Sequence, residues 1–202
     1  MLRLWPKPNG ALDAVTETFF MPPLAQALAP ESFLTTAFTT EKRVLRRKGG
    51  HVGIDWNGPV CNCGKRGCIE TLAAGPAIAR RARQKLARNS NSILLEMAGG
   101  DIQKVSGQMV GRAHAEGDPV ATEVMQETLD LLAYWLGSII DLLEPDIIVI
   151  GGGVSSLLAP FLDEIRERWR GTCINPAPLS IPLVLAHYGE DAGITGAAAL
   201  CD

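Results

Sequence analysis

The sequence contains few aromatic residues, little net charge and no long apolar run. Aromatic side chains make up 5% of its 202 residues, and the formal net charge at pH 7 is −3. A charge so close to balance gives no reason to expect a nucleic-acid partner or binding to an anionic membrane surface. No apolar stretch reaches the roughly 18 residues that a transmembrane helix needs, so no membrane span is expected.

Cysteine is also scarce, except in one short segment. The chain has five cysteines, an odd number, and three of them fall within residues 61–68. A pair of prolines near the N-terminus stands where a signal peptide would carry its apolar segment. We therefore expect a reduced, cytoplasmic protein in which the clustered cysteines bind a metal. The isolated Cys173 and Cys201 are interpreted as packing residues.

From Asp118 onward, the residue pattern predicts an α/β fold. Asp118 is a good N-cap, Pro119 suits the first helical position, and the helix that they begin is expected to stop at Glu144. A continuous apolar run over 146–150 predicts a buried parallel strand, and a glycine turn follows it. The further elements expected are a strand over 181–185 and helices over 76–88, 101–115, 154–169 and 189–200. Strands that alternate with helices in this way are typical of a parallel sheet covered by helices.

Residues 1–48 do not continue this pattern. Neither the helical period of about 3.6 residues nor the strand period of about 2 persists in them for more than one turn. We therefore divide the chain into an anomalous leader, residues 1–48, which we expect to be poorly ordered, and an α/β domain, residues 49–202. The domain begins with a loop at 51–70 that carries the clustered cysteines.

The most specific motif is Gly50-His51 followed by the three cysteines. Zinc binds four nitrogen or sulfur ligands in a tetrahedron, and one histidine with three cysteines is a common closed set. We therefore predict a zinc site at His51, Cys61, Cys63 and Cys68, on a tight loop whose turns use glycine. A closed set leaves no ligand position for water, so the zinc is predicted to be structural. The alternative is three buried thiols beside an unrelated histidine.

This motif resembles the zinc motif of the ROK family of bacterial repressors, open reading frames and sugar kinases. The residues that carry the resemblance are Gly50-His51 and Cys61-x-Cys63-Gly64-x-x-Gly67-Cys68-x-Glu70. The strand and glycine turn at 146–155 and the helix at 191–198 resemble further parts of the family. The resemblance covers about residues 49–202. It implies the C-terminal lobe of an actin-like (ribonuclease H-like) ATPase fold, with a zinc loop and with its N-terminal lobe missing.

The resemblance also implies an ATP-dependent kinase that phosphorylates a hexose, either glucose or an N-acetylhexosamine. His51 would contact the sugar as well as zinc, and Glu70 would accept hydrogen bonds from sugar hydroxyls. Gly151, Gly152 and Gly153 would let the backbone approach the nucleotide, which binds as Mg-ATP. Two alternatives stay open: a solvated loop carboxylate at position 70, and a plain turn at the glycines. The sugar and ATP are the implied partners, and a homodimer is compatible with these features.

Several parts that the family requires are not found before His51. A kinase of this family has an N-terminal lobe with a glycine-rich phosphate loop. It also has an Asn-Asp pair, whose aspartate takes the proton of the attacking hydroxyl. A sugar-binding glutamate is expected three residues before the histidine, where this chain has Lys48. We therefore assign no catalytic residue and expect the chain, as written, to be inactive.

A shifted reading frame is our hypothesis for the leader, and the alternative is a divergent, loop-rich segment. Reading the back-translated codons of residues 25–48 one base earlier permits an alternation of glycine and threonine. The same reading permits Ala-Ala-Glu at its end, which places a glutamate over Lys48. A return to frame within the glycine codons at 49 and 50 would restore the domain. We therefore interpret residues 1–48 as a frameshifted read of the family's segment.

Two alternatives to a kinase fragment stay open. One is a fragment of a sugar-responsive ROK repressor, which would need a winged-helix DNA-binding segment; nothing basic and helical of that size is apparent. The other is a non-catalytic domain that zinc stabilises.

Overall fold

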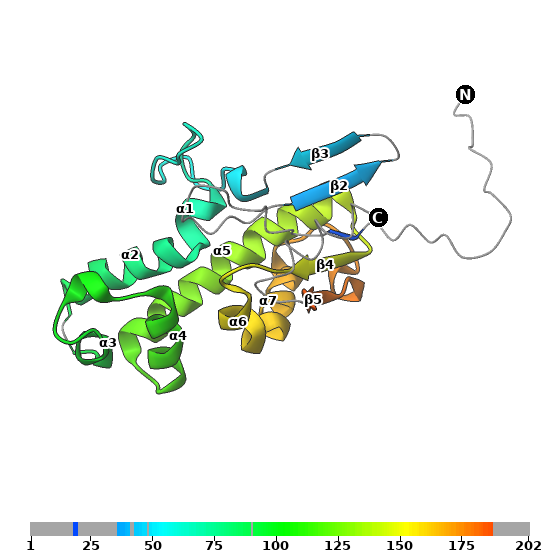
Figure 1. Cartoon of the computed structure of the whole chain (residues 1–202). Helices are drawn as coiled ribbons and strands as arrows, with labels where there is room; N and C mark the ends of the chain where they lie inside the picture. Colours follow the sequence, from blue (N-terminus) through cyan, green and yellow to red (C-terminus); the bar gives the residue numbers. More distant parts are fainter. Residues whose placement is uncertain (1–17, 20–35, 41–42, 48, 90, 188–202) are drawn as a thin grey trace, which may run out of the picture.

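The computed structural model describes the backbone of residues 18–19, 36–40 and 43–47 and the whole of residues 49–89 and 91–187 (Figure 1). The helix predicted at 189–200 and Cys201 lie outside the described residues, as does most of the leader. Among the described helices, none combines the length and the apolar character that crossing a bilayer requires.

Helix α5, Pro119–Leu143, is the longest element of the described chain. It begins where Asp118 caps it and ends at Glu144, whose φ of 44° is left-handed and which directly precedes Pro145. Proline disfavours a helical conformation at the residue before it, so the helix stops there. Both predicted ends of this helix are confirmed. The helices that pack against it are α1 (Ile69–Ala73), α2 (Gly75–Leu86), α4 (Gly107–Ala115) and α7 (Leu162–Arg168).

The cap of α5 also holds a second helix. The Asp118 carboxylate accepts hydrogen bonds from the backbone N–H of Ala121 at 2.8 Å and of Ile93 at 2.9 Å. Ile93 is the first residue of α3, Ile93–Met97. Asp118 is 4% exposed, so one buried carboxylate satisfies N–H groups at the starts of two helices.

We expect Asp118→Ala to lower the free energy of unfolding by about 2–3 kcal/mol, because two N–H groups lose their acceptor. Asp101→Ala is the matched control. Asp101 caps the short 3-10 helix η2, Ile102–Lys104, from a side chain that is 46% exposed, so its loss should cost less than about 1 kcal/mol. Urea unfolding followed by circular dichroism measures both variants. Equal losses would contradict the role of Asp118 in two helices.

Strand β4, Ile147–Ile150, is the middle strand of a three-stranded parallel sheet. It pairs with β1, Thr18–Phe19, on one side and with β5, Leu183–Leu185, on the other. Three of its four residues are buried, so the prediction of a central buried strand is confirmed. β5 starts directly after Pro182, which has no N–H for a sheet hydrogen bond.

Three short strands lie within the leader. β2 (Thr36–Thr40) and β3 (Arg43–Arg47) form an antiparallel pair that precedes the 3-10 helix η1, Gly49–His51. β1 joins the sheet of the α/β domain at the register Thr18↔Ile147. The sequence pattern predicted none of these strands, because no strand period persists over residues 1–48.

Two segments predicted as single helices are divided, and those predictions were wrong. Residues 154–169 form α6 (Ser155–Leu158), η3 (Ala159–Phe161) and α7, with η4 (Trp169–Gly171) at the end. Pro160 lies at the division, and its missing N–H cannot continue the α-helical hydrogen bonds. Residues 101–115 form η2 and then α4, because the Ser106 hydroxyl accepts from the Met109 N–H and caps a new helix.

Two apolar clusters share α5. The first lies between the sheet, α5 and α7, and it includes Trp135, Trp169 and Ile148, which are at most 1% exposed. Leu179 of the 3-10 helix η5, Pro178–Ser180, packs against this cluster. The second lies among α2, α3, α4 and the first half of α5, and it includes the fully buried Met125. α5 therefore connects the sheet to the group formed by helices α2, α3 and α4.

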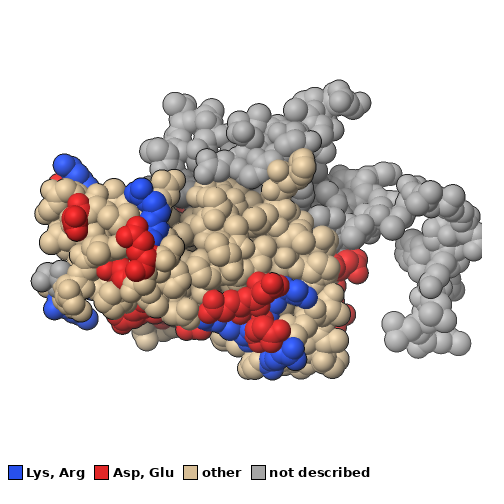
Figure 2. Space-filling model, turned by 90° about the horizontal axis from the view of Figure 1, so that it is seen from below, with Lys and Arg blue, Asp and Glu red and all other residues tan. Residues whose placement is uncertain are grey.

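Charged side chains of α5 are paired with those of its neighbours. Lys85 of α2 lies 2.6 Å from a Glu123 oxygen and 2.7 Å from a Glu127 oxygen, and Arg168 of α7 lies 2.6 Å from Asp130. Figure 2 shows acidic and basic side chains in mixed groups on the face of the molecule that it views. That face therefore presents no extended field of one sign among the described residues.

Candidate metal centre

The loop at 51–70 closes through backbone contacts around Gly67. The Gly67 N–H donates to the Pro59 carbonyl at 2.9 Å, and the Gly67 carbonyl accepts from the Ile54 N–H at 2.9 Å. The φ of Gly67 is +60°, and a Cβ built on it would lie 1.7 Å from the carbonyl oxygen of Asp55. Only glycine fits this crossing. The loop therefore folds back on itself and brings its two ends together.

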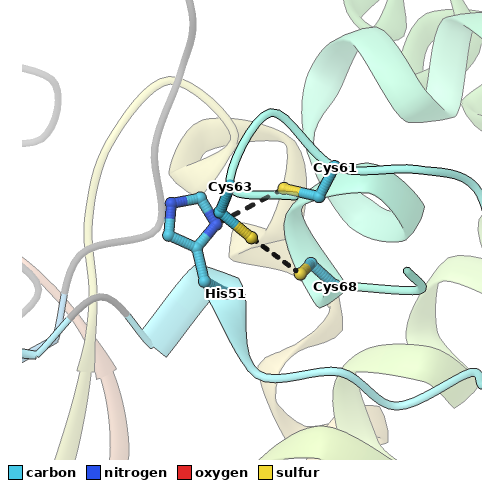
Figure 3. A group of neighbouring side chains, drawn as sticks. All are labelled: His51, Cys61, Cys63 and Cys68. Carbon is cyan, nitrogen blue, oxygen red and sulfur yellow. Dashed lines mark hydrogen bonds between the residues drawn. The ribbon is translucent and has the colours of Figure 1, made fainter. Parts of the chain in front are cut away.

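Four candidate ligands converge in this loop (Figure 3). The donor atoms of His51, Cys61, Cys63 and Cys68 all lie within 4.8 Å of one another. Cys61 Sγ is 3.5 Å from His51 Nδ1, and Cys63 Sγ is 3.6 Å from Cys68 Sγ. Sulfur ligands of tetrahedral zinc, each about 2.3 Å from the ion, lie about 3.8 Å apart. The four residues that the sequence singled out are thus together, and their donor set and spacing fit Zn²⁺.

The cysteines of the cluster differ in exposure, and the pKa values of Cys63 and Cys68 are shifted in opposite directions. Cys61 and Cys68 are buried, whereas Cys63 is exposed. Burial raises the pKa of the Cys68 thiol to about 12, and a hydrogen bond from the backbone N–H of Lys65 lowers the pKa of Cys63. A buried thiolate is therefore costly without a cation beside it. A divalent metal that replaces the thiol proton offsets this cost.

Glu70 lies beside the cluster. It occupies the first turn of α1, and its Oε2 is 3.6 Å from Nδ1 of His51. Lys65 Nζ donates to the His51 carbonyl at 3.3 Å, which ties the cysteine turn to the residue that begins the loop. The side chains of His51 and Glu70 are 14% and 10% exposed. An imidazole and a carboxylate are therefore held together next to the cysteines, largely shielded from water.

The glycines Gly151–Gly153 follow β4 at the carboxyl edge of the parallel sheet, as predicted. Gly152 has a φ of +94°, which favours glycine, and its carbonyl accepts hydrogen bonds from the N–H and the hydroxyl of Ser155 at 2.9 and 2.7 Å. Open α/β sheets bind ligands at this edge. Sequence reasoning missed Ser155 as a support of the turn; its place directly after the glycines was the available signal.

The glycine turn lies next to the start of α2, which in turn lies next to the start of α4. A Cβ on Gly75, the first residue of α2, would lie 3.7 Å from Cγ1 of Val154. A Cβ on Gly107, the first residue of α4, would lie 3.0 Å from the Gly75 carbonyl. Glu70 lies in the first turn of α1, whose five residues span about 7.5 Å and lead to the start of α2. The metal centre and the glycine turn thus lie near the two ends of one short helix.

The segment that contains this site matches a known protein family and several of its members. The profile of the ROK family matches residues 46–202. A glucokinase from Thermotoga maritima is 32% identical over 151 residues, which are 75% of this chain and 47% of that protein. An N-acetylmannosamine kinase from Salmonella newport is 31% identical over 151 residues, which are 75% of this chain and 45% of that protein. The chain therefore spans about half the length of these relatives.

Comparison with solved structures shows the same fold. A ROK family glucokinase from Streptomyces griseus, in complex with glucose and AMPPNP, superposes with a TM-score of 0.73 at 28% identity, covering 84% of this chain and 57% of that one. A ROK family transcriptional regulator, a homologue of the E. coli MLC protein, superposes with a TM-score of 0.66 at 27% identity, covering 82% of this chain and 42% of that one. Kinases and a regulator thus share the architecture of this chain.

Proposed function

Because the chain belongs to the ROK family, we propose that residues 49–202 form the sugar- and nucleotide-binding lobe of an ATP-dependent kinase that acts on a hexose. The observation that carries the proposal is the contact between His51 and Glu70 beside the cysteine cluster, within the segment that the family profile matches. Since the chain spans about half of its relatives, the activity of a whole kinase is part of this proposal.

Glu70 is the residue that we assign to the sugar hydroxyls. An ionised carboxylate only accepts hydrogen bonds, and hydroxyls donate them, so the pairing is chemically matched. The Glu70 side chain is 10% exposed, and water therefore competes little for these bonds. The glucose in the Streptomyces griseus complex and the N-acetylmannosamine kinase among the relatives support a hexose or an N-acetylhexosamine.

His51, Cys61, Cys63 and Cys68 are assigned as ligands of a structural zinc ion. When bound, Zn²⁺ would supply four fixed bonds and leave no open position for water. The protein's own residues, and not the zinc ion, then contact the sugar. His51 is fixed in orientation through its ring nitrogen, and the closed loop keeps Glu70 beside it.

The nucleotide is assigned to the corner at Gly151–Gly153. The N-termini of α2 and α4, helices of 12 and 9 residues, meet beside this turn. Helix N-termini carry unpaired N–H groups and a partial positive charge that favour phosphate groups. The AMPPNP in the Streptomyces griseus complex supports ATP, which binds as its Mg²⁺ complex.

We expect the 202-residue chain with Mg-ATP to phosphorylate neither hexoses nor N-acetylhexosamines. Phosphoryl transfer needs a base at the acceptor hydroxyl. In the loop at 51–70 the one aspartate is Asp55, which accepts a hydrogen bond from the Asn57 N–H within its own turn. Loss of the general base lowers a rate by about 10²–10⁴-fold. A coupled assay of ADP release measures the turnover, and a clear rate would contradict the absence of a base.

The same assay tests the kinase itself on a chain whose reading frame is restored over residues 1–48 and which is joined to the family's N-terminal lobe with its Asn-Asp pair. This chain should phosphorylate a hexose, and Glu70→Gln should lower kcat/KM by about 10–100-fold, because a charged hydrogen-bond acceptor is lost. Glu167→Gln, on the exposed side of α7, is the control and should leave kcat/KM unchanged. A restored chain that binds DNA in a sugar-dependent way without phosphorylating sugar would favour the repressor, a candidate that the fold of the regulator supports.

We also propose that residues 1–48 are a frameshifted read. The family match begins at residue 46, close to the glycine codons at 49 and 50 where the frame would be restored, and this supports the proposal. The nucleotide sequence of the gene across codons 1–51 is the direct test. A sequence in which no single insertion or deletion yields the Gly-Thr alternation and the glutamate over Lys48 would refute it.

A further inference from the structure

Cys63 is the one cysteine of the metal centre that faces solvent. Cys61 and Cys68 are 3% and 0% exposed. The residue after Cys63, Gly64, has no described atom within 4 Å of the position that a Cβ would take, so the turn stands open. An oxidant must reach a sulfur atom in order to react with it. Solvent access therefore favours Cys63 over the other two cysteines.

A second sulfur atom is placed to react with an oxidised Cys63. Cys68 Sγ is 3.6 Å from Cys63 Sγ, and Figure 3 shows the two atoms facing each other. The third sulfur, that of Cys61, instead faces Nδ1 of His51 at 3.5 Å. A disulfide bond of about 2.05 Å requires the Cys63 and Cys68 sulfur atoms to approach by about 1.5 Å. The open turn at Gly64 lies between these two cysteines and can absorb that movement.

We propose that Cys63 is a site of oxidation by hydrogen peroxide and that its reaction, completed by Cys68, releases the metal. The Cys63 thiolate attacks the peroxide, the O–O bond breaks, and Cys63 becomes a sulfenic acid while hydroxide leaves. The Cys68 thiolate then attacks the Cys63 sulfur, the S–O bond breaks, and a second hydroxide leaves. The balance is two thiolates and one peroxide converted to one disulfide and two hydroxides.

The oxidised loop loses two of its four metal ligands. His51 and Cys61 remain, and two ligands do not form the closed tetrahedral set that holds zinc. Cys68 pairs with Gly53 and stands directly before α1, two residues before Glu70. Oxidation therefore loosens the segment that positions Glu70 and His51. This inference rests on the metal centre of the proposed function but not on kinase activity.

The test follows zinc and thiols in the full chain, with Cys173→Ser and Cys201→Ser so that every thiol belongs to the cluster. Zinc content is measured first, hydrogen peroxide is added, and zinc release is followed with a chromophoric chelator. We expect one zinc released for two thiols lost, reversed by dithiothreitol. Trypsin cuts after Lys65 and Arg66, so mass spectrometry of the digest shows Cys68 linked to the peptide of Cys61 and Cys63. Fragmentation identifies which of those two cysteines is joined.

Two variants separate Cys63 from the cluster as a whole. Cys63→His keeps a zinc ligand without an oxidisable sulfur and should release zinc at least about 10-fold more slowly. Cys61→His makes the same exchange at a buried position and should release zinc as fast as the parent chain. Zinc retained by the parent under peroxide, or a disulfide that leaves Cys63 free, would overturn the proposal. The digest of the parent chain decides the question even where a variant fails to load zinc. A parent chain without zinc before peroxide would refute the metal centre itself.

Discussion

Replacing Cys68 with serine is expected to strip zinc from the chain and to lower its Tm by about 8–20 °C. Apparent zinc affinities of structural sites correspond to about 10–16 kcal/mol, and one ligand of four is removed from a position that is 0% exposed. A loss of about 4–5 kcal/mol shifts the Tm of a domain of this size by roughly 2–4 °C per kcal/mol. Metal analysis by mass spectrometry and thermal unfolding by circular dichroism measure the two effects.

Cys173→Ser and chelation provide the controls for this result. Cys173 is a half-buried thiol outside the cluster, so its replacement should leave one zinc per chain. EDTA should lower the Tm of the parent chain toward that of Cys68→Ser and should leave Cys68→Ser itself unchanged, since the metal is already lost. A parent chain whose Tm does not respond to EDTA would contradict a structural role for zinc.

Gly67→Ala is expected to weaken zinc binding by about 100-fold or more. The added Cβ would lie 1.7 Å from the Asp55 carbonyl oxygen. The hydrogen bond from the Ile54 N–H to the Gly67 carbonyl holds the two crossing backbone segments close together. The backbone must therefore separate, and Cys68, the next residue, moves with it. Competition with a chromophoric chelator at pH 7 measures the dissociation constant of zinc.

Gly64→Ala is the matched control, because it shares the backbone strain but not the clash. Gly64 has a φ of +87°, and no described atom lies within 4 Å of its Cβ position. Its replacement should cost only the left-handed conformation, about 1–2 kcal/mol, or roughly a tenfold change in affinity. Equal losses at the two positions would show that left-handed strain, and not the crossing at Asp55, explains the effect.

The four residues that converge in the candidate metal centre could be predicted from the sequence. Thiolates and imidazole are the donors that zinc prefers, and the short spacing between Cys61, Cys63 and Cys68 keeps them on one loop whatever the rest of the chain does. The two ends of α5 could be predicted for the same reason. Asp118 with Pro119, and Glu144 before Pro145, act through local sterics and hydrogen bonds that do not depend on distant contacts.

Other features depend on residues far apart in the chain, and only the tertiary structure decided them. The pairing of β1 with β4 joins Thr18 to Ile147, and no local period signals it. The exposure of Cys63 and the burial of Cys68 follow from how the loop closes at Gly67 and how α1 packs on α5, not from the spacing of the cysteines. Residue type and spacing predicted which donor atoms come together. The long-range packing decided which sulfur meets solvent and where Glu70 lies, because burial is a property of the whole fold.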